Sequence, residues 1–319
     1  MLAICYFRVG RMVRPNGSGD VDVFKGRIMT VRTRKSMGNR RRLAKTTLAV
    51  SMMLPLGAVF MSFGGGAAAA TSKSTLKPPT ILSAGKLQYC SDMSSPPLES
   101  LNSSLKPVGS DIGIGNSIAA LMGLKPEWQQ TAFSGIVPAL QAGHCDAILS
   151  QLYIKPARKL VVNFVPYMYS SESVTVPSAN PGNITGLDSS LCGQKVATVT
   201  GTTAQTELAT VSAACTAAGK SGVNVVLFTS DPLALQNMLS GLSDAYTTTS
   251  ETAAYYMKTT PGQFKFAGQP FGKILTGIAV NKGNPKLLKA IQHAFAQIMA
   301  NGTYNRVMSQ WGLQRDELH

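Results

Sequence analysis

The sequence predicts an α/β protein with two lobes, and three observations support this prediction. From residue 86 onward, short apolar runs alternate with helical patterns, which is typical of a mostly parallel sheet. This alternation occurs twice in succession, so one α/β unit follows another along the chain. The 319 residues, of which 44% are hydrophobic, are also enough to form two cores of ordinary size.

The expected elements follow from the spacing of apolar residues. In the first set, we expect strands at 87–90 and 146–149, helices at 112–122 and 136–142, and an extended segment at 160–164. In the second set, we expect strands at 195–199, 224–228 and 244–247, with helices at 203–218 and 232–240 between them. A strand at 275–280 and helices at 285–300 and 304–311 are predicted to close the chain.

The N-terminal segment 37–70 has the three parts of a cleavable export signal. Basic residues at 39–45 precede an uncharged apolar run at 46–63, and four alanines follow at 67–70. We therefore expect a signal peptide, a mature chain that begins near Thr71, and a periplasmic location. A membrane anchor is the weaker alternative because a proline interrupts the apolar run. Either general secretion or the twin-arginine route fits the basic stretch.

Residues 1–36 precede this signal and have no hydrophobic period, so they are either an extension of the gene model or a disordered segment. The net charge of +15 is concentrated near the N-terminus. Residues 1–70 carry 12 basic and 2 acidic side chains, whereas residues 71–319 carry 18 basic and 13 acidic ones. Because the basic excess belongs mainly to the leader, we do not expect the mature protein to bind nucleic acid.

Four cysteines lie in the part predicted to be exported, where disulfides can form. Cys192 and Cys215 flank one strand and helix, and we expect them to form a disulfide bond. Cys90 and Cys145 either form a second bond or remain as buried thiols. The chain has three histidines and no Cys-x-x-Cys spacing, so we expect neither a metal nor a cofactor.

Four polar loops follow the carboxyl ends of the expected strands, which is where open α/β sheets bind ligands. These loops cover residues 91–99, 150–158, 200–204 and 247–251. Each of them is rich in Ser, Thr or charged residues. The sequence therefore predicts a ligand site formed by these four loops.

Seven segments between residues 87 and 312 resemble, in order, those of the family-3 extracellular solute-binding proteins, the polar amino acid receptors of ABC importers. The segments are 91–99, 109–111, 133–148, 154–159, 201–204, 277–285 and 301–304. The resemblance implies a type II periplasmic-binding-protein fold in which the chain crosses twice between the lobes. We expect lobe 1 to contain 71–171 and 280–319, lobe 2 to contain 172–279, and the hinges to lie near 170–173 and 277–280.

The resemblance also implies which residues bind the ligand. Arg158 matches the position that binds the α-carboxylate, and a guanidinium suits that role because it can donate two parallel hydrogen bonds. Thr203 matches a second carboxylate contact at the start of a helix, where free N–H groups attract anions. Asp92 and Ser150 match positions that contact the rest of the ligand. A surface arginine, a helix cap, a turn aspartate and a strand-end serine are the respective structural alternatives.

The sequence departs from the family pattern where the ligand's amine would bind. Tyr153 and Thr249 replace the usual acceptors, and Glu251 is a candidate to supply the missing charge, although it could equally be a solvated loop residue. The implied ligand is therefore a small carboxylate, and the sequence leaves open whether it carries an amine.

The predicted function is that of a monomeric receptor that closes around a small carboxylate, an amino acid or a related compound, and delivers it to an ABC permease. We expect no catalytic residues, because no Ser-His-Asp, Cys-His or paired-carboxylate arrangement is evident. The alternatives are a secreted enzyme of the same fold that acts as a dehydratase on cyclic acids, and a receptor for a separate sensor protein.

Overall fold

The computed structural model describes residues 80–318. The expected export signal at 37–70, the start near Thr71 and the N-terminal extension lie outside the described residues. Within residues 80–318, nine strands form one mixed sheet in the order β5-β1-β6-β12-β7-β10-β8-β9, and β11 pairs with β7. Three short strands form a second sheet, in the order β2-β3-β4.

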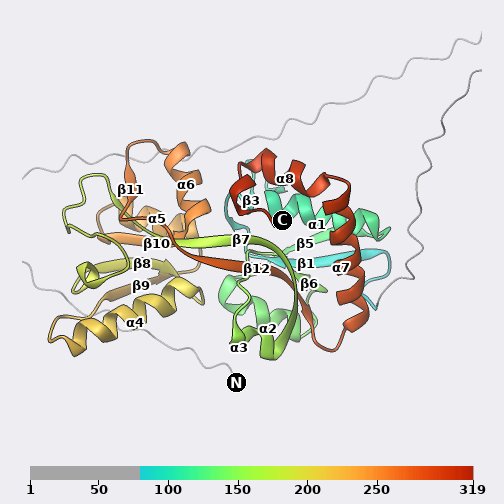
Figure 1. Cartoon of the computed structure of the whole chain (residues 1–319), viewed down its shortest axis with the longest axis horizontal. Coiled ribbons are helices and arrows are strands. Elements are labelled where there is room, and N and C mark those ends of the chain that lie inside the picture. Colours follow the sequence, from blue (N-terminus) through green and yellow to red (C-terminus); the bar gives the residue numbers. More distant parts are fainter. Residues whose placement is uncertain (1–79, 319) are drawn as a thin grey trace, which may run out of the picture. The chain divides into compact units, whose positions relative to one another are not determined.

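Two long antiparallel strands connect the two halves of the sheet (Figure 1). They are β7 (Val162–Pro177) and β12 (Phe271–Asn281). The first half contains β1 (Lys86–Ser91), β5 (Lys125–Gln130) and β6 (Ala147–Ile148). The second half contains β8 (Lys195–Val199), β9 (Asn224–Phe228), β10 (Ala245–Thr249) and β11 (Phe264–Phe266). This is the mixed α/β, two-lobed arrangement that the repeated pattern predicts.

The first lobe has helices on both faces of its strands. They are α1 (Ser110–Leu121), α2 (Ile136–Gln141), α3 (Pro156–Val161), α7 (Pro285–Ala300) and α8 (Thr303–Trp311). The small sheet of β2 (Ser94–Ser95), β3 (Glu99–Leu101) and β4 (Pro107–Val108) belongs to this lobe, as do two 3-10 turns at Phe133–Gly135 and Gln314–Asp316. Tyr89, Ile118 and Ile291 are among the fully buried residues of its main core.

The second lobe places three helices around β8, β9 and β10 (Figure 1). They are α4 (Thr203–Ala217), α5 (Asp231–Leu239) and α6 (Ser250–Thr259), and a 3-10 turn covers Ser189–Leu191. Val196 and Leu208 are fully buried in one core of this lobe, and Ala197 and Tyr246 are fully buried in another. Burial of these apolar side chains from water is the main stabilising contribution to the lobe.

Most of the predicted elements are observed within two residues of their expected ends, and the differences have local causes. The extended segment expected at 160–164 begins only at Val162, because Pro156 starts the short helix α3. Strand β5 was not expected, since its sequence, KPEWQQ, is polar for a strand. Helix α6 was not expected either, because its polar first turn resembles a loop.

Both candidate cysteine pairs form disulfide bonds in the structure. Cys90 is bonded to Cys145, and Cys192 is bonded to Cys215. The first bond lies in lobe 1, and the second joins the segment before β8 to α4 in lobe 2. None of the helices in residues 80–318 combines the length and apolar character that a membrane span requires.

Candidate functional site

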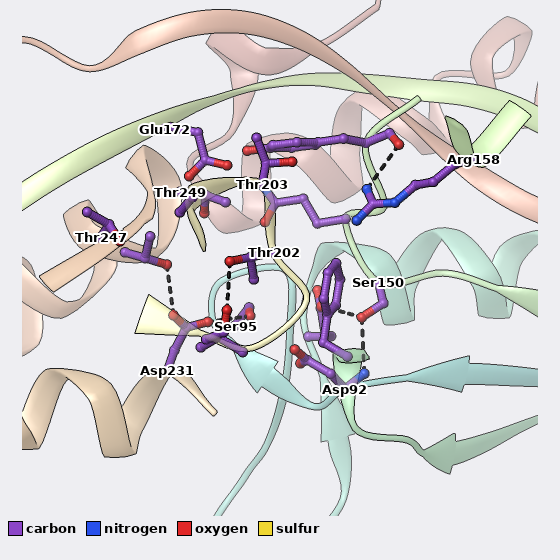
Figure 2. Close-up of a pocket in the computed structure, with 17 residues that line it drawn as sticks. Asp92, Ser95, Ser150, Arg158, Glu172, Thr202, Thr203, Asp231, Thr247 and Thr249 are labelled. Carbon is purple, nitrogen blue, oxygen red and sulfur yellow. Dashed lines mark hydrogen bonds between the residues drawn. The ribbon is translucent and has the colours of Figure 1, made fainter. Parts of the chain in front are cut away.

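A pocket lies where the four predicted loops meet, and β7 contributes to its wall (Figure 2). The space enclosed by its walls is about 490 Å³, part of which is open to solvent. Its lining residues are Asp92, Ser95, Glu99, Phe133, Ser150, Gln151, Tyr153, Arg158, Glu172, Val199, Thr202, Thr203, Ala204, Asp231, Thr247, Thr248 and Thr249. The pocket therefore has one wall from each lobe, and six of the seven predicted ligand-binding residues line it.

Arg158 reaches the pocket from helix α3. One guanidinium nitrogen, Nη1, donates to the carbonyl oxygen of Tyr153 at 3.1 Å, and the guanidinium lies 5.6 Å from the ring centre of Phe133. These contacts fix the plane of the guanidinium without neutralising it. Among residues 80–318, no carboxylate lies within 4.0 Å of this cation. An arginine held in this way can donate to an anion that enters the pocket.

The N-terminus of α4 faces the pocket from the second lobe. Thr202 is the N-cap residue and its side chain accepts from the backbone N–H of Gln205 at 3.3 Å, so the cap is Thr202 and not Thr203. Thr203 and Ala204, in the first turn, line the pocket. First-turn N–H groups have no partner within their helix, and the helix dipole favours a negative charge there. Arg158 and α4 thus form two sides of a site suited to a carboxylate.

The first lobe contributes a hydrogen-bonded group of polar side chains at another part of the pocket. The Ser150 hydroxyl accepts from the backbone N–H of Asp92 at 3.0 Å and donates to Oε1 of Glu99 at 2.8 Å. The Asp92 carboxylate accepts from the backbone N–H of Ser94 at 2.7 Å through Oδ1. Asp92 and Glu99 are both buried, with exposed fractions of 7% and 1%.

Two buried carboxyl groups that line the pocket come from outside the four predicted loops. Glu172 comes from β7, where it follows two serines and is the one charged residue of the strand. Asp231 is the first residue of α5, and Ser95 of lobe 1 donates to its Oδ2 atom at 2.7 Å. An acidic residue within a buried strand could have indicated the first. The second resembles an ordinary residue of a helix start, so the sequence alone gave no signal.

Glu251 lies behind the wall of the pocket rather than in it. Its Oε2 atom accepts from the Gln151 side chain at 3.2 Å and from the Ser170 hydroxyl at 3.0 Å. Tyr153 is connected to the same group, because its hydroxyl is 3.0 Å from that of Ser170. Gln151 and Tyr153 line the pocket, so Glu251 can affect a ligand through them.

Burial raises the pKa values of these carboxyl groups. It raises the pKa of Asp92 to about 7, with a further contribution from the Asp231 charge. Burial and the charges of Glu207 and Glu251 raise the pKa of Glu172 to about 8. The pKa of Glu99 is also raised, first by burial and then by neighbouring carboxylates. In each case the loss of hydration on burial is the largest cause, and it disfavours the ionised form.

The described residues contain no group of three or more His, Cys, Asp or Glu side chains that could hold a metal ion. The pocket instead combines one guanidinium, a helix N-terminus, hydroxyl groups and carboxyl groups. This combination is suited to binding a small molecule that carries both negative and positive charge.

Comparison with known proteins gives relatives across most of the chain. The L-cystine-binding protein TcyJ of Escherichia coli strain K12 is 27% identical over 217 residues, which cover 68% of this chain and 78% of that protein. The ABC transporter arginine-binding protein 1 of the same strain is 27% identical over 264 residues, covering 81% and 98%. A solved structure of an ancestral arginine-binding protein bound to glutamine matches with a TM-score of 0.67 and 32% identity, covering 72% of this chain and 99% of that one.

The family model for bacterial extracellular solute-binding proteins, family 3, matches residues 87–314. This match covers most of the chain and includes both lobes and every residue that lines the pocket. The chain therefore belongs to the bacterial extracellular solute-binding proteins of family 3.

Proposed function

We propose that this chain is the periplasmic receptor of an ABC importer and that it binds an amino acid between its two lobes. The observation that carries the proposal is the pairing of Arg158 from one lobe with the N-terminus of α4 from the other at a single pocket. A carboxylate between them would receive donors from both sides, which would hold the lobes together. The ligands named for the relatives, cystine and arginine, are amino acids.

In this proposal, the α-carboxylate binds to Arg158 and the first turn of α4, including Thr203. The α-ammonium binds near Glu172 and Thr249, which are paired across β7 and β10 and both line the pocket. Asp92 and Ser150 contact the distal part of the ligand, and Tyr153 shapes the wall beside Arg158. Glu251 acts indirectly, because its contacts are to Gln151 and Ser170.

The remaining parts of the proposal concern the whole protein. We propose that lobe 1 comprises 71–171 and 280–319, that lobe 2 comprises 172–279, and that β7 and β12 act as the hinge. The mature protein works as a monomer and passes its ligand to a permease. Export by a cleaved signal at 37–70 is supported by the sequence pattern alone.

Arg158→Ala tests the proposal. Isothermal titration of purified residues 71–319 against the common amino acids should identify a ligand, and the substitution should weaken its binding by roughly 2 to 5 kcal/mol. The melting temperature without ligand should change little, because Arg158 lies at the pocket and not in either core. Unchanged affinity in a folded variant would contradict the assigned role, and binding of no amino acid at all would contradict the function.

A dehydratase acting on cyclic carboxylic acids is the second candidate function. Glu172 favours it, because a buried carboxyl with a pKa of about 8 is protonated at neutral pH and could donate a proton to a leaving group. Incubation with candidate cyclic acids, followed by analysis of products, distinguishes the two functions. A receptor leaves the ligand unchanged. An enzyme converts it to a product, and the Glu172→Gln substitution should abolish formation of that product.

A further inference from the structure

Two buried carboxyl groups lie side by side on the lobe 1 side of the pocket. Glu99 is the first residue of β3, and Asp111 lies in the first turn of α1. Their segments are held together by backbone hydrogen bonds, since the N–H of Asp111 donates to the carbonyl oxygen of Leu98 at 3.0 Å. The two carboxyl groups are also hydrogen-bonded to each other, and this bond lowers the pKa of Asp111. A hydrogen bond between two carboxyl groups requires a proton on one of them.

Each of these carboxyl groups has one oxygen atom with another donor and one without. The Oε1 atom of Glu99 accepts from the Ser150 hydroxyl at 2.8 Å. The Oδ2 atom of Asp111 accepts from the backbone N–H of Gln151 at 3.0 Å and from the Tyr167 hydroxyl at 2.8 Å. The other two atoms, Oε2 of Glu99 and Oδ1 of Asp111, are buried and receive no N–H or hydroxyl donor from the described residues. One proton between these two atoms supplies the partner that both of them need.

The surroundings of the two carboxyl groups place this proton on Glu99. Asp111 accepts two hydrogen bonds on Oδ2 and lies at the start of a helix, and both features favour its ionised form. Burial raises the pKa of Asp111 to about 6, which still leaves this group ionised at neutral pH. The pKa of Glu99 is raised well above its ordinary value, first by burial and then by the charges of Asp111 and Asp92. Glu99 therefore keeps the proton and donates a hydrogen bond to Asp111.

The groups around the two carboxyl groups offer no positive charge that could stabilise a second carboxylate. The other titratable groups coupled to them are acids and phenols, namely Asp92, Asp231, Tyr167 and Tyr304. Within the described residues, the one ion pair joins Lys86 to Glu127, so neither Glu99 nor Asp111 takes part in one. Two adjacent carboxylates in a water-poor site repel each other strongly. Ionisation of both groups would therefore drive them apart.

The two carboxyl groups hold the turn formed by Ser150 and Gln151, and both residues of this turn line the pocket. Glu99 accepts from the side chain of Ser150, and Asp111 accepts from the backbone of Gln151. Gln151 has a φ of +43°, a left-handed conformation that is unfavourable for a residue with a side chain and persists only where contacts enforce it. The hydrogen bond from its N–H group to Asp111 is one such contact. Ser150 and Gln151 therefore reach the pocket from positions that the two carboxyl groups fix.

We propose that Glu99 and Asp111 share one proton and act together as a positioning pair, which fixes Ser150 and Gln151 in the geometry that the pocket needs. The effect of the pair on a ligand rests on the proposed function, whereas the shared proton does not. Loss of the proton places two carboxylates next to each other. Their repulsion disturbs the hydrogen bonds to Ser150 and Gln151, so ligand affinity falls at alkaline pH.

Carbon-13 NMR of the side-chain carboxyl groups in the ligand-free protein tests the shared proton directly. At neutral pH, the Glu99 resonance should be that of a protonated acid and the Asp111 resonance that of a carboxylate. When Glu99 loses its proton at higher pH, the backbone amide resonance of Gln151 should shift with the same midpoint. A Glu99 carboxyl group that titrates near its ordinary value of about 4.3 would overturn the inference. A Gln151 amide resonance that does not follow Glu99 would overturn the positioning role.

Titration with each of the common amino acids, repeated across a range of pH, tests the effect on the pocket. Glu99→Ala removes the acceptor for Ser150 and the donor for Asp111, and it should weaken binding by about 10-fold or more. Glu99→Gln replaces both contacts, because an amide oxygen accepts and an amide NH2 group donates without a titrating proton. This variant should recover most of the affinity that Glu99→Ala loses, and its affinity should decline less at alkaline pH. Glu127→Gln, which removes an acid outside the pocket, is the control and should leave the affinity and its pH profile unchanged.

Failure of this inference and failure of the proposed function give different results. A folded Glu99→Ala protein with full affinity, or a Glu99→Gln protein as weak as Glu99→Ala, would overturn the positioning role and leave the receptor function intact. Binding of none of the amino acids would instead contradict the proposed function, and the NMR titration would still decide whether the proton is shared and whether Gln151 responds to it. If a Glu99 variant does not fold, the same NMR titration of the unaltered protein decides the inference.

Discussion

At the scale of single residues, two glutamates with similar burial have different surroundings. Glu172 and Glu251 are 3% and 6% exposed, and burial raises the pKa of each. Glu172 lines the pocket, whereas Glu251 is surrounded by the donors Gln151, Ser170 and Ser250. A glutamate is therefore available to a ligand at position 172, whereas at position 251 it supports the wall of the pocket.

This difference predicts unequal effects of the same substitution. Glu172→Gln should weaken binding of an amino acid by roughly 1 to 3 kcal/mol, because an amide cannot lose a proton and pair with the α-ammonium as the Glu172 carboxyl can when the ligand binds. Glu251→Gln is the matched control, and its effect on affinity should be clearly smaller. Titration of both proteins, with melting curves to confirm folding, measures the difference. A larger loss of affinity for Glu251→Gln would assign the amine contact to that residue instead.

At the scale of elements, the loop between β8 and α4 forms part of the pocket wall and also contacts the other lobe. Gly201 has a φ of +83°, and a Cβ atom there would lie 2.8 Å from the Cα atom of Ser134 in lobe 1. The absence of a side chain lets this loop approach lobe 1 and brings the N-terminus of α4 to the pocket. Gly201 therefore allows both the positive φ of the β8–α4 loop and the close approach of this loop to Ser134.

Gly201→Ala should consequently reduce ligand affinity by preventing this approach. Gly241→Ala is a suitable control, since its φ is +74° but nothing lies within 4 Å of the added atom. Both changes should lower stability by about 1 to 2 kcal/mol through backbone strain. Only Gly201→Ala should weaken binding, which titration and melting curves can establish. Equal affinities in the two variants would show that the contact with Ser134 does not matter for closure.

At the scale of the whole molecule, the buried acids around the pocket couple stability to pH. Burial raises the pKa values of Asp111, Asp92 and Glu172 to about 6, 7 and 8 respectively. Between their ordinary values and these raised ones, the folded protein binds more protons than the unfolded chain. Their stabilising contribution is therefore complete below about pH 4 and is lost as the pH rises through 6 to 8.

The ligand-free protein should accordingly have a lower melting temperature at pH 8.5 than at pH 5.5. Scanning fluorimetry across this range measures the slope, and Glu172→Gln should make it shallower because the amide does not titrate. A melting temperature that does not fall over this interval would show that these groups keep ordinary pKa values, and are therefore solvated, in the ligand-free protein. In an open form of the receptor, the pocket carboxyl groups would be exposed to water, so the pH dependence also indicates whether the ligand-free lobes are closed.

The sequence by itself determined the α/β class, the duplication into two lobes and the four loops at the strand ends, and the family resemblance added the prediction that Arg158 binds a ligand carboxylate. These follow from local patterns, because hydrophobic period, helix starts and short motifs are encoded by neighbouring residues. Only the tertiary structure decided which acids line the pocket. Glu172 and Asp231 enter the pocket from β7 and α5, and Glu251 lies behind it. Such placements depend on strand pairing and lobe contact between distant residues, which no local pattern specifies.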